Sequence, residues 1–242
     1  MRVQAIISYD GSAYFGMQKQ PHKQTIQDRI EIALSSLNIA PHINYSGRTD
    51  TGVHALNQSI DFEIPHYWYN LEKLKSKLNS ILIPQRIMIK IIRKVDDNFH
   101  SRFMATKRSY RYLITDKLTP FNINYTFYKK NLNIEKMQNG ANLFVGEHNF
   151  EYFKKNGSEI KDSIRKIYDF KITTFKNYVI MRVLANGFLR SQIRFMVGSL
   201  IMLSDNLINF RDIELQLSME QKKNLIIAPS SGLYFERSYY DR

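Results

Sequence analysis

Hydrophobic and polar positions in the first part of the chain follow two different periods. Residues 3–9 and 57–64 alternate apolar and polar side chains, which is typical of strands with one buried face. Residues 25–38 and 70–82 instead place apolar side chains on one face of a helix, and Thr25 is a suitable N-cap for the first of them. A strand pattern returns at residues 86–95. This part of the chain therefore predicts the order strand, helix, strand, helix, strand.

A second series of elements follows. Residues 108–116 predict a strand, 134–146 a helix, 164–186 a strand pair with a polar turn at Lys176 and Asn177, 188–203 a buried helix, and 232–240 a closing strand. We expect an α+β fold of two similar halves with mostly antiparallel sheets. The predicted domains are 1–103 and 104–242. No Gly- or Ser-rich linker separates them, so we expect the halves to share a rigid interface.

Composition excludes several classes of protein. No apolar run approaches the roughly 20 residues that span a bilayer, and the alternating N-terminus is typical of a strand rather than a signal peptide. The chain has no cysteine, which excludes disulfides and thiolate metal sites. These features favour a cytoplasmic protein.

The charge favours a polyanionic partner. The 242 residues include 35 Lys and Arg against 22 Asp and Glu, a net charge of +13. The excess is spread along the chain, because 13 basic and 9 acidic residues precede residue 104 and the others follow it. Such an excess replaces the counterions of a nucleic acid, and the 15 Tyr and 15 Phe could stack on bases. Improved solubility alone is the alternative interpretation.

Metal and phosphate motifs are not recognisable in the sequence. No two of the six histidines have helical i, i+4 spacing, and none joins acidic residues in a ligand run. A Gly-rich phosphate loop and a G-x-S-x-G nucleophile elbow are also missing. We therefore expect chemistry that needs neither a metal nor a cofactor.

The segment SGRTDTGVHA, residues 46–55, is the strongest candidate for chemistry. Arg48 and Asp50 are two residues apart, and Gly47 and Gly52 allow a sharp turn and a close approach of a ligand. A carboxylate can act as a covalent nucleophile while it is ionised, and a guanidinium nearby favours the ionised form. A solvated turn with an incidental ion pair remains the alternative.

Six segments of the chain resemble motifs of one protein family and occur in the same order as in that family. The nine residues GRTDTGVHA resemble the G-R-T-D-A-G-V-H-A signature of the A-type tRNA pseudouridine synthases, which act on the anticodon arm. The segments YDGSAYFGMQKQP, RFMATKRSYRYLI, VGEHNFEYF, NGFLRSQIRFMVGSL and APSSGLYF resemble further motifs of that family. Met17, Thr51, Asn149 and Ile193 depart from its usual residues, and none of the four removes a group that the chemistry needs.

The resemblance implies a reaction and a fold. Asp50 is the implied nucleophile, which starts cleavage of the N-glycosidic bond of a flipped-out uridine so that the base can rejoin the ribose through C5. The reaction is an isomerisation and needs no cofactor. The family acts at positions 38, 39 and 40 of tRNA, has its active site in a cleft between two halves, and suggests a homodimer.

The resemblance also assigns catalytic roles to two residues outside the loop. Tyr110 would stack on the target base, although in a strand it shares a face with Tyr112 and either ring could be core. Arg194 would pair with Asp50 and keep it ionised. Its i, i+4 neighbour Arg190 would share its helix face, and the pair could otherwise form a solvated polar stripe.

The remaining candidates would bind or position the substrate. Leu233 would form an apolar wall of the uracil pocket, or simply core. Arg48 would pair with Asp50 or bind a phosphate. We expect His54 to position the loop by hydrogen bonds in preference to acting as a general base. A non-catalytic RNA-binding module and a nuclease are the competing functions, and neither needs the GRTDTGVHA segment.

Overall fold

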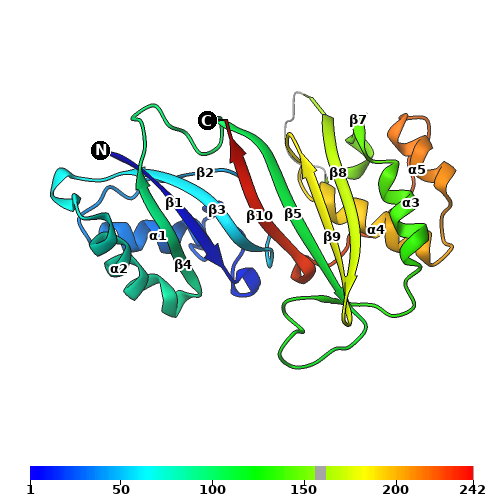
Figure 1. Cartoon of the computed structure of the whole chain (residues 1–242), viewed down its shortest axis with the longest axis horizontal. Coiled ribbons are helices and arrows are strands. Elements are labelled where there is room, and N and C mark those ends of the chain that lie inside the picture. The colour runs from blue at the N-terminus through cyan, green and yellow to red at the C-terminus, as the bar shows by residue number, and fades with distance from the viewer. Residues whose placement is uncertain (156–161, 242) are drawn as a thin grey trace. The chain divides into compact units, whose positions relative to one another are not determined.

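The computed structural model describes residues 1–155 and 162–241, which form two units (Figure 1). The first unit is Met1–Thr106 together with Tyr234–Arg242, and the second is Lys107–Leu233. The sequence-based division put residues 104–242 in one domain. The last strand, however, packs with the first unit, so the chain leaves that unit and returns to it.

The first unit contains a sheet in the order β4-β1-β3-β10, with β2 paired to β3. β1 is antiparallel to both β3 and β4, and β10 runs parallel to β3, with Tyr234 opposite His54. The bounds of these strands are β1 (Arg2–Tyr9), β2 (Asn44–Tyr45), β3 (His54–Glu63), β4 (Ile87–Lys94) and β10 (Leu233–Tyr240).

Two helices accompany this sheet, α1 (Ile26–Ser35) and α2 (Leu71–Leu82). Thr25 begins α1 through a capping box with Asp28, which confirms the N-cap expected from the sequence. Each helix turns an apolar face inward, and α2 packs on both α1 and β4. Short 3-10 turns complete the unit: η1 (Gly11–Ala13), η2 (His66–Trp68) and η3 (Ile83–Gln85).

The second unit contains a sheet in the order β5-β9-β8-β7, with β6 parallel to β5. The helix α3 packs on α4 and on β8 (Figure 1). Its elements are β5 (Ala105–Thr115), β6 (Phe127–Tyr128), α3 (Ile134–Asn142), β7 (Gly146–Asn149), η4 (Glu151–Phe153), β8 (Ile164–Phe175), β9 (Tyr178–Ala185), α4 (Gln192–Ser204), α5 (Phe210–Leu217) and η5 (Ser230–Gly232).

The α+β fold with mostly antiparallel strands is confirmed, and so are most of the expected elements. The predicted turn at Lys176 and Asn177 connects β8 to β9. The helix expected over 188–203 begins later, at Gln192, because Ser191 has a left-handed backbone with φ of 58° that helices do not adopt. No helix in residues 1–155 and 162–241 is long and apolar enough to cross a membrane.

Candidate active site

The loop between β2 and β3 carries Asp50, and backbone hydrogen bonds tie it to the segment that follows β1. The Met17 N–H donates to the Thr49 carbonyl oxygen at 3.2 Å, and the Gly52 N–H donates to the Tyr14 oxygen at 3.2 Å. One bond lies on each side of Asp50. The backbone that presents this carboxyl group is therefore fixed at both ends.

Two glycines allow these segments to approach each other closely. A Cβ on Gly16, whose φ is +90°, would lie 2.4 Å from the Thr49 oxygen. A Cβ on Gly11 would lie 2.0 Å from the Val53 oxygen. Both distances are far below van der Waals contact, so the loop can keep its position only if these residues have no side chain.

Side-chain hydrogen bonds also fix this loop to buried residues of the first unit. The hydroxyl groups of Tyr9 and Thr49 lie 2.8 Å apart, and both side chains are buried. The Ser46 hydroxyl donates to the Gln58 side-chain oxygen at 2.7 Å, and the Gln58 amide donates to the Gly47 carbonyl. The loop is thus part of the buried polar structure of the first unit.

Arg48 and Asp50 lie at different depths on this loop. Arg48 is exposed, Thr49 between them is buried, and Asp50 is half-buried. A half-buried carboxyl group on a fixed backbone can reach a bound molecule without a rearrangement of the chain. Exposure of Arg48 suits it to a phosphate as well as to a neighbouring carboxylate.

His54, at the start of β3, is buried and held on three sides. Its Nδ1 accepts a hydrogen bond from the Gly11 N–H at 3.1 Å, and Asp10 Oδ1 lies 3.3 Å from the same nitrogen. Asp10 also pairs with Arg86 at 3.1 Å. The imidazole stacks on Tyr234, with ring centroids 4.7 Å apart. These contacts connect the end of the loop to the turn after β1 and to β10.

Tyr110 and Tyr112 both lie on β5 and are both buried, at 7% and 1% exposure. Tyr110 packs edge-to-face on Phe188 with centroids 5.2 Å apart. The Tyr112 hydroxyl donates to the Pro229 carbonyl at 2.8 Å, and burial raises the pKa of this phenol far above its ordinary value. Tyr112 is therefore a core residue anchored by its hydroxyl.

Arg194, in the first turns of α4, is fixed by the segment before η5. Its Nε donates to the Ala228 oxygen at 2.7 Å, and the Ala228 N–H donates to the Arg194 oxygen at 3.1 Å. This pair of bonds orients the guanidinium of a half-buried side chain. An oriented guanidinium can bind a carboxylate or a phosphate in a defined geometry.

The prediction that Arg190 and Arg194 share one helix face is wrong. Arg190 precedes the N-cap Ser191 and is exposed, and its carbonyl accepts a hydrogen bond from the Lys155 N–H at 3.0 Å. The left-handed backbone of Ser191 breaks the helical spacing on which the prediction depended.

Leu233 is buried, at 5% exposure, and directly follows η5 in the second unit. Arg48, Asp50 and His54 belong to the first unit, and the other candidates belong to the second. The cleft between the halves and the pairing of Asp50 with Arg194 stay predictions.

Sequence reasoning missed several residues that support these side chains. Asp10 and Tyr234 hold His54, and Ala228 orients Arg194. The closely spaced glycines of the segment YDGSAYFG, residues 9–16, were a usable signal for a tight turn near the loop. The part of the chain that the structure describes contains no group of three or more His, Asp or Glu that could hold a metal ion.

Comparison with known proteins gives matches over nearly the whole chain. A family model described as tRNA pseudouridine synthase matches residues 5–104 and 141–241. Proteins called tRNA pseudouridine synthase A are similar: that of Campylobacter jejuni strain RM1221 is 35% identical, covering 99% of this chain and all of its own. That of Limosilactobacillus reuteri strain DSM 20016 is 37% identical over 96% of this chain and 94% of its own.

A protein of the same name from Helicobacter pylori strain G27 is 37% identical, with 98% of each chain covered. Among solved structures, a chain of a Cbf5-Nop10-Gar1 complex superimposes with a TM-score of 0.41 at 13% identity. That match covers 96% of this chain and 48% of the other.

Proposed function

Because the chain belongs to the tRNA pseudouridine synthase family, we propose that it isomerises uridine to pseudouridine in the anticodon stem-loop of tRNA. The targets are the uridines at positions 38, 39 and 40, as the sequence motifs of this family imply. The observation that carries the proposal is the loop of residues 46–53, which presents the half-buried Asp50 on a backbone fixed at both ends.

Asp50 is the nucleophile in this proposal. Its attack starts cleavage of the bond between N1 of uracil and C1′ of the ribose. The base then turns and its C5 bonds to C1′. C5 loses its proton, N1 gains one, and Asp50 is released as the carboxylate, so the product has the composition of the substrate. Every atom of the substrate apart from exchanged protons remains in the product, so the reaction consumes no cofactor.

The second unit supplies the other two catalytic groups of the proposal. Tyr110 stacks on the flipped uracil, since a phenol ring has a π-face for the base and a hydroxyl for a polar contact. Arg194 keeps Asp50 ionised, because a guanidinium within a few ångströms favours the charged carboxylate. The hydrogen bond from Arg194 to Ala228 supports this role by fixing the guanidinium.

Four further residues hold the substrate or the loop. Leu233 forms an apolar wall beside the uracil, and the exposed Arg48 and Arg190 bind phosphates. His54 positions the loop, which its bond from the Gly11 N–H supports.

The net charge of +13 has a role in the same proposal. A uridine in a stem-loop must leave its stack before Asp50 can reach it, which costs a few kcal/mol. Lys and Arg side chains on the phosphates offset that cost. The proposed partner is therefore tRNA, and we also expect a homodimer that works in the cytoplasm.

Mapping of pseudouridine in a tRNA transcript tests the function. Purified protein is incubated with a transcript that has uridine at positions 38, 39 and 40, and with a matched transcript that has cytidine there. We expect pseudouridine only in the first transcript and only at these positions. Modification elsewhere would overturn the proposed target, and binding without modification would identify a non-catalytic RNA-binding protein.

A salt series tests the two roles proposed for arginine. Arg48→Ala should weaken tRNA binding and lower the slope of log K against log salt by roughly one, because one phosphate contact is lost. Arg194→Ala should lower the single-turnover rate more than the affinity. An Arg194→Ala protein with a full rate and weakened binding would make Arg194 a phosphate ligand instead.

A further inference from the structure

A pocket of about 340 Å³ lies in the first unit, beside the loop that carries Asp50. Its volume falls within the range of about 300–1,000 Å³ that is usual for small-ligand sites. The lining side chains come from three separated parts of the chain and include Lys19, Gln27, Tyr45, Arg102 and Phe103. The pocket therefore offers an aromatic surface, amide groups and positive charge.

Phe103 is the main aromatic surface of the pocket, and 75% of it is exposed. The His100 ring packs against it with centroids 4.2 Å apart, and the Arg102 guanidinium lies 5.7 Å from the ring centroid. The backbone N–H of Arg102 donates to His100 Nδ1 at 3.1 Å, so the imidazole is itself oriented. An exposed phenylalanine is thus held by an imidazole packed against it and a guanidinium over its ring, while much of its surface faces water.

A buried polar network fixes the turn from which Phe103 projects. Ser101 is fully buried, and its N–H donates to Asp61 Oδ1 at 2.7 Å. Its hydroxyl lies 3.1 Å from that of Ser59, and its carbonyl accepts from the Tyr240 hydroxyl at 2.8 Å. The turn is thus held by groups on β3 and β10.

Asp61 connects this network to β2, the strand that directly precedes the loop of residues 46–53. It is fully buried, pairs with Arg2 at 2.6 Å and accepts from the Asn44 amide at 2.9 Å. Asn44 is the residue before Tyr45, which lines the pocket. Such a network stabilises a defined backbone position, and a backbone fixed beneath an exposed aromatic ring is a rigid stacking surface.

The pocket is close to Asp50 along two segments of chain. Tyr45 precedes Asp50 by five residues, a span of at most about 18 Å even if fully extended. Lys19 lies two residues after Met17, whose N–H is bonded to the Thr49 oxygen of the loop. A nucleotide in the pocket could therefore belong to the same RNA loop as a uridine that reaches Asp50.

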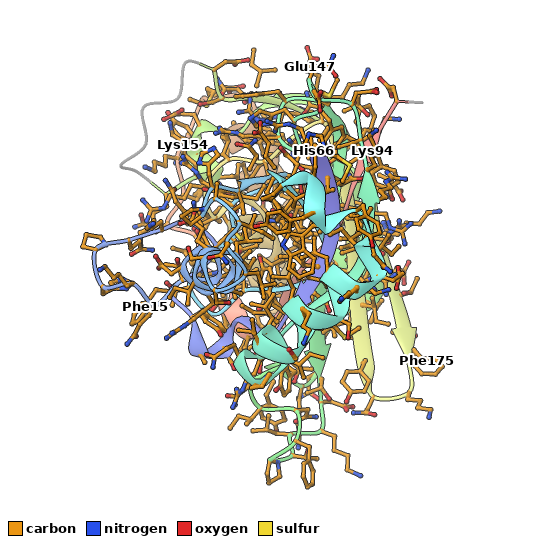
Figure 2. All side chains as sticks on the ribbon, turned by 90° about the vertical axis from the view of Figure 1, so that its left-hand side faces the viewer. Phe15, His66, Lys94, Glu147, Lys154 and Phe175 are labelled. Atoms are coloured by element: carbon orange, nitrogen blue, oxygen red, sulfur yellow. The ribbon has the colours of Figure 1, made fainter. Side chains whose placement is uncertain are left out.

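Two other exposed phenylalanines have only part of this support: the His22 ring packs against Phe15, and the Lys176 ammonium lies 5.5 Å from the Phe175 ring centroid. Phe15 projects from the segment before α1 and Phe175 from the end of β8 (Figure 2). Neither lines the pocket. Phe103 differs from them because it combines exposure, a guanidinium beside its ring, a buried network beneath its turn and a pocket in front of it.

We propose that this pocket binds a second nucleotide of the substrate RNA, outside the helical stack, with its base stacked on Phe103 and its phosphate near Arg102. This inference rests on the proposed function, because it takes tRNA as the substrate. Base–aromatic stacking tolerates any base, so the pocket fixes the position of the RNA loop rather than reading its sequence. It would explain how several neighbouring uridines can be treated by one protein without a sequence-specific contact.

The test combines protein variants with a stem-loop in which one non-target loop nucleotide at a time is made abasic. The variants are Phe103→Ala, Phe103→Trp and the matched control Tyr69→Ala, which removes another exposed ring of the first unit. Single-turnover rates at increasing protein concentration give the half-saturating concentration and the maximal rate. Circular dichroism verifies that each variant is folded.

We expect Phe103→Ala to raise the half-saturating concentration about 5- to 140-fold, the factor equivalent to a stacking energy of about 1–3 kcal/mol. Phe103→Trp should restore it, and Tyr69→Ala should leave it unchanged. One abasic position should weaken binding to the wild-type protein by a similar factor, with no further loss when it is combined with Phe103→Ala.

Two results would overturn the proposal. One is an unchanged half-saturating concentration for Phe103→Ala. The other is a wild-type protein that binds every abasic stem-loop equally well, which needs no variant and so does not depend on folding. Formation of pseudouridine by the wild-type protein in either case would show that the proposed function stands without the pocket. If the wild-type protein forms none, the proposed function and this inference fail together.

Discussion

Gly16→Ala should lower the reaction rate by displacing Asp50, beyond any effect that it has through the stability of the fold. The backbone of Gly16 has φ of +90°, and an added Cβ would lie 2.4 Å from the Thr49 oxygen and 3.2 Å from the Asp50 carbonyl carbon. These are backbone atoms and cannot rotate away as the end of a side chain can. The loop must therefore shift, or the chain around residue 16 must.

The expected cost follows from these contacts. A left-handed backbone costs an alanine roughly 1–2 kcal/mol. Loss of the bond from the Met17 N–H to the Thr49 oxygen adds about 0.5–1.5 kcal/mol. The free energy of unfolding should therefore fall by about 1.5–3.5 kcal/mol. A 1 Å displacement of a catalytic group can lower a rate by about 100-fold, so the single-turnover rate should fall much more than tRNA affinity.

The assay measures urea unfolding, tRNA binding and the release of tritium from C5 of labelled uridine under single-turnover conditions. Leu78→Ala is the control for stability alone: it removes a buried side chain of α2, which costs about 2–5 kcal/mol, and does not touch the loop. A folded Gly16→Ala protein with the rate of Leu78→Ala would refute the argument that the Gly16 backbone sets the position of Asp50.

Three further predictions concern stacking, the core and metals. Tyr110→Phe should keep the tRNA affinity of the wild-type protein, while Tyr110→Ala should lose about 1–3 kcal/mol of binding free energy. Equal affinity of the wild-type protein and both variants in a binding titration would place Tyr110 away from the flipped base. Tyr112→Phe should lower the free energy of unfolding by about 0.5–1.5 kcal/mol, because the part-buried hydrogen bond to the Pro229 carbonyl is lost. The pKa of Tyr112 is raised in the folded chain, so the stability that its protonated phenol provides is complete below the unfolded pKa near 10.0 and declines above it. Urea unfolding of both proteins from pH 8 to 11 should therefore show a weaker alkaline decline for Tyr112→Phe, and an identical decline would contradict the assignment. Removal of divalent ions with EDTA should leave the rate unchanged on a correctly folded tRNA, whereas a loss restored by one divalent ion would reveal a missed metal site.

Local patterns predicted the elements whose signals are local. The capping residue Thr25 and the apolar spacing of Ile26, Ile30 and Leu34 are sufficient to predict α1, and the structure buries all three apolar side chains. The missed helix α5 also had a local signal, since Asn209 and Asp212 form a capping box at its start. That helix could have been predicted.

Other features depend on contacts that no local pattern contains. The N-terminal end of α4 depends on a left-handed serine at position 191, where glycine or asparagine would have given a signal. The return of β10 to the first unit depends on its pairing with β3, far away in sequence. The pocket at Phe103 likewise joins three distant segments, and no local pattern in the sequence shows that they lie together.

The most direct test of the central claim is the single-turnover rate of Asp50→Asn. The amide keeps the shape of the carboxyl group and removes the negative charge that a nucleophile needs. We predict a folded protein that binds tRNA with nearly unchanged affinity, releases no tritium from C5 of uridine and forms no pseudouridine. Measurable turnover by a preparation free of wild-type protein would contradict the assignment of Asp50 as the nucleophile.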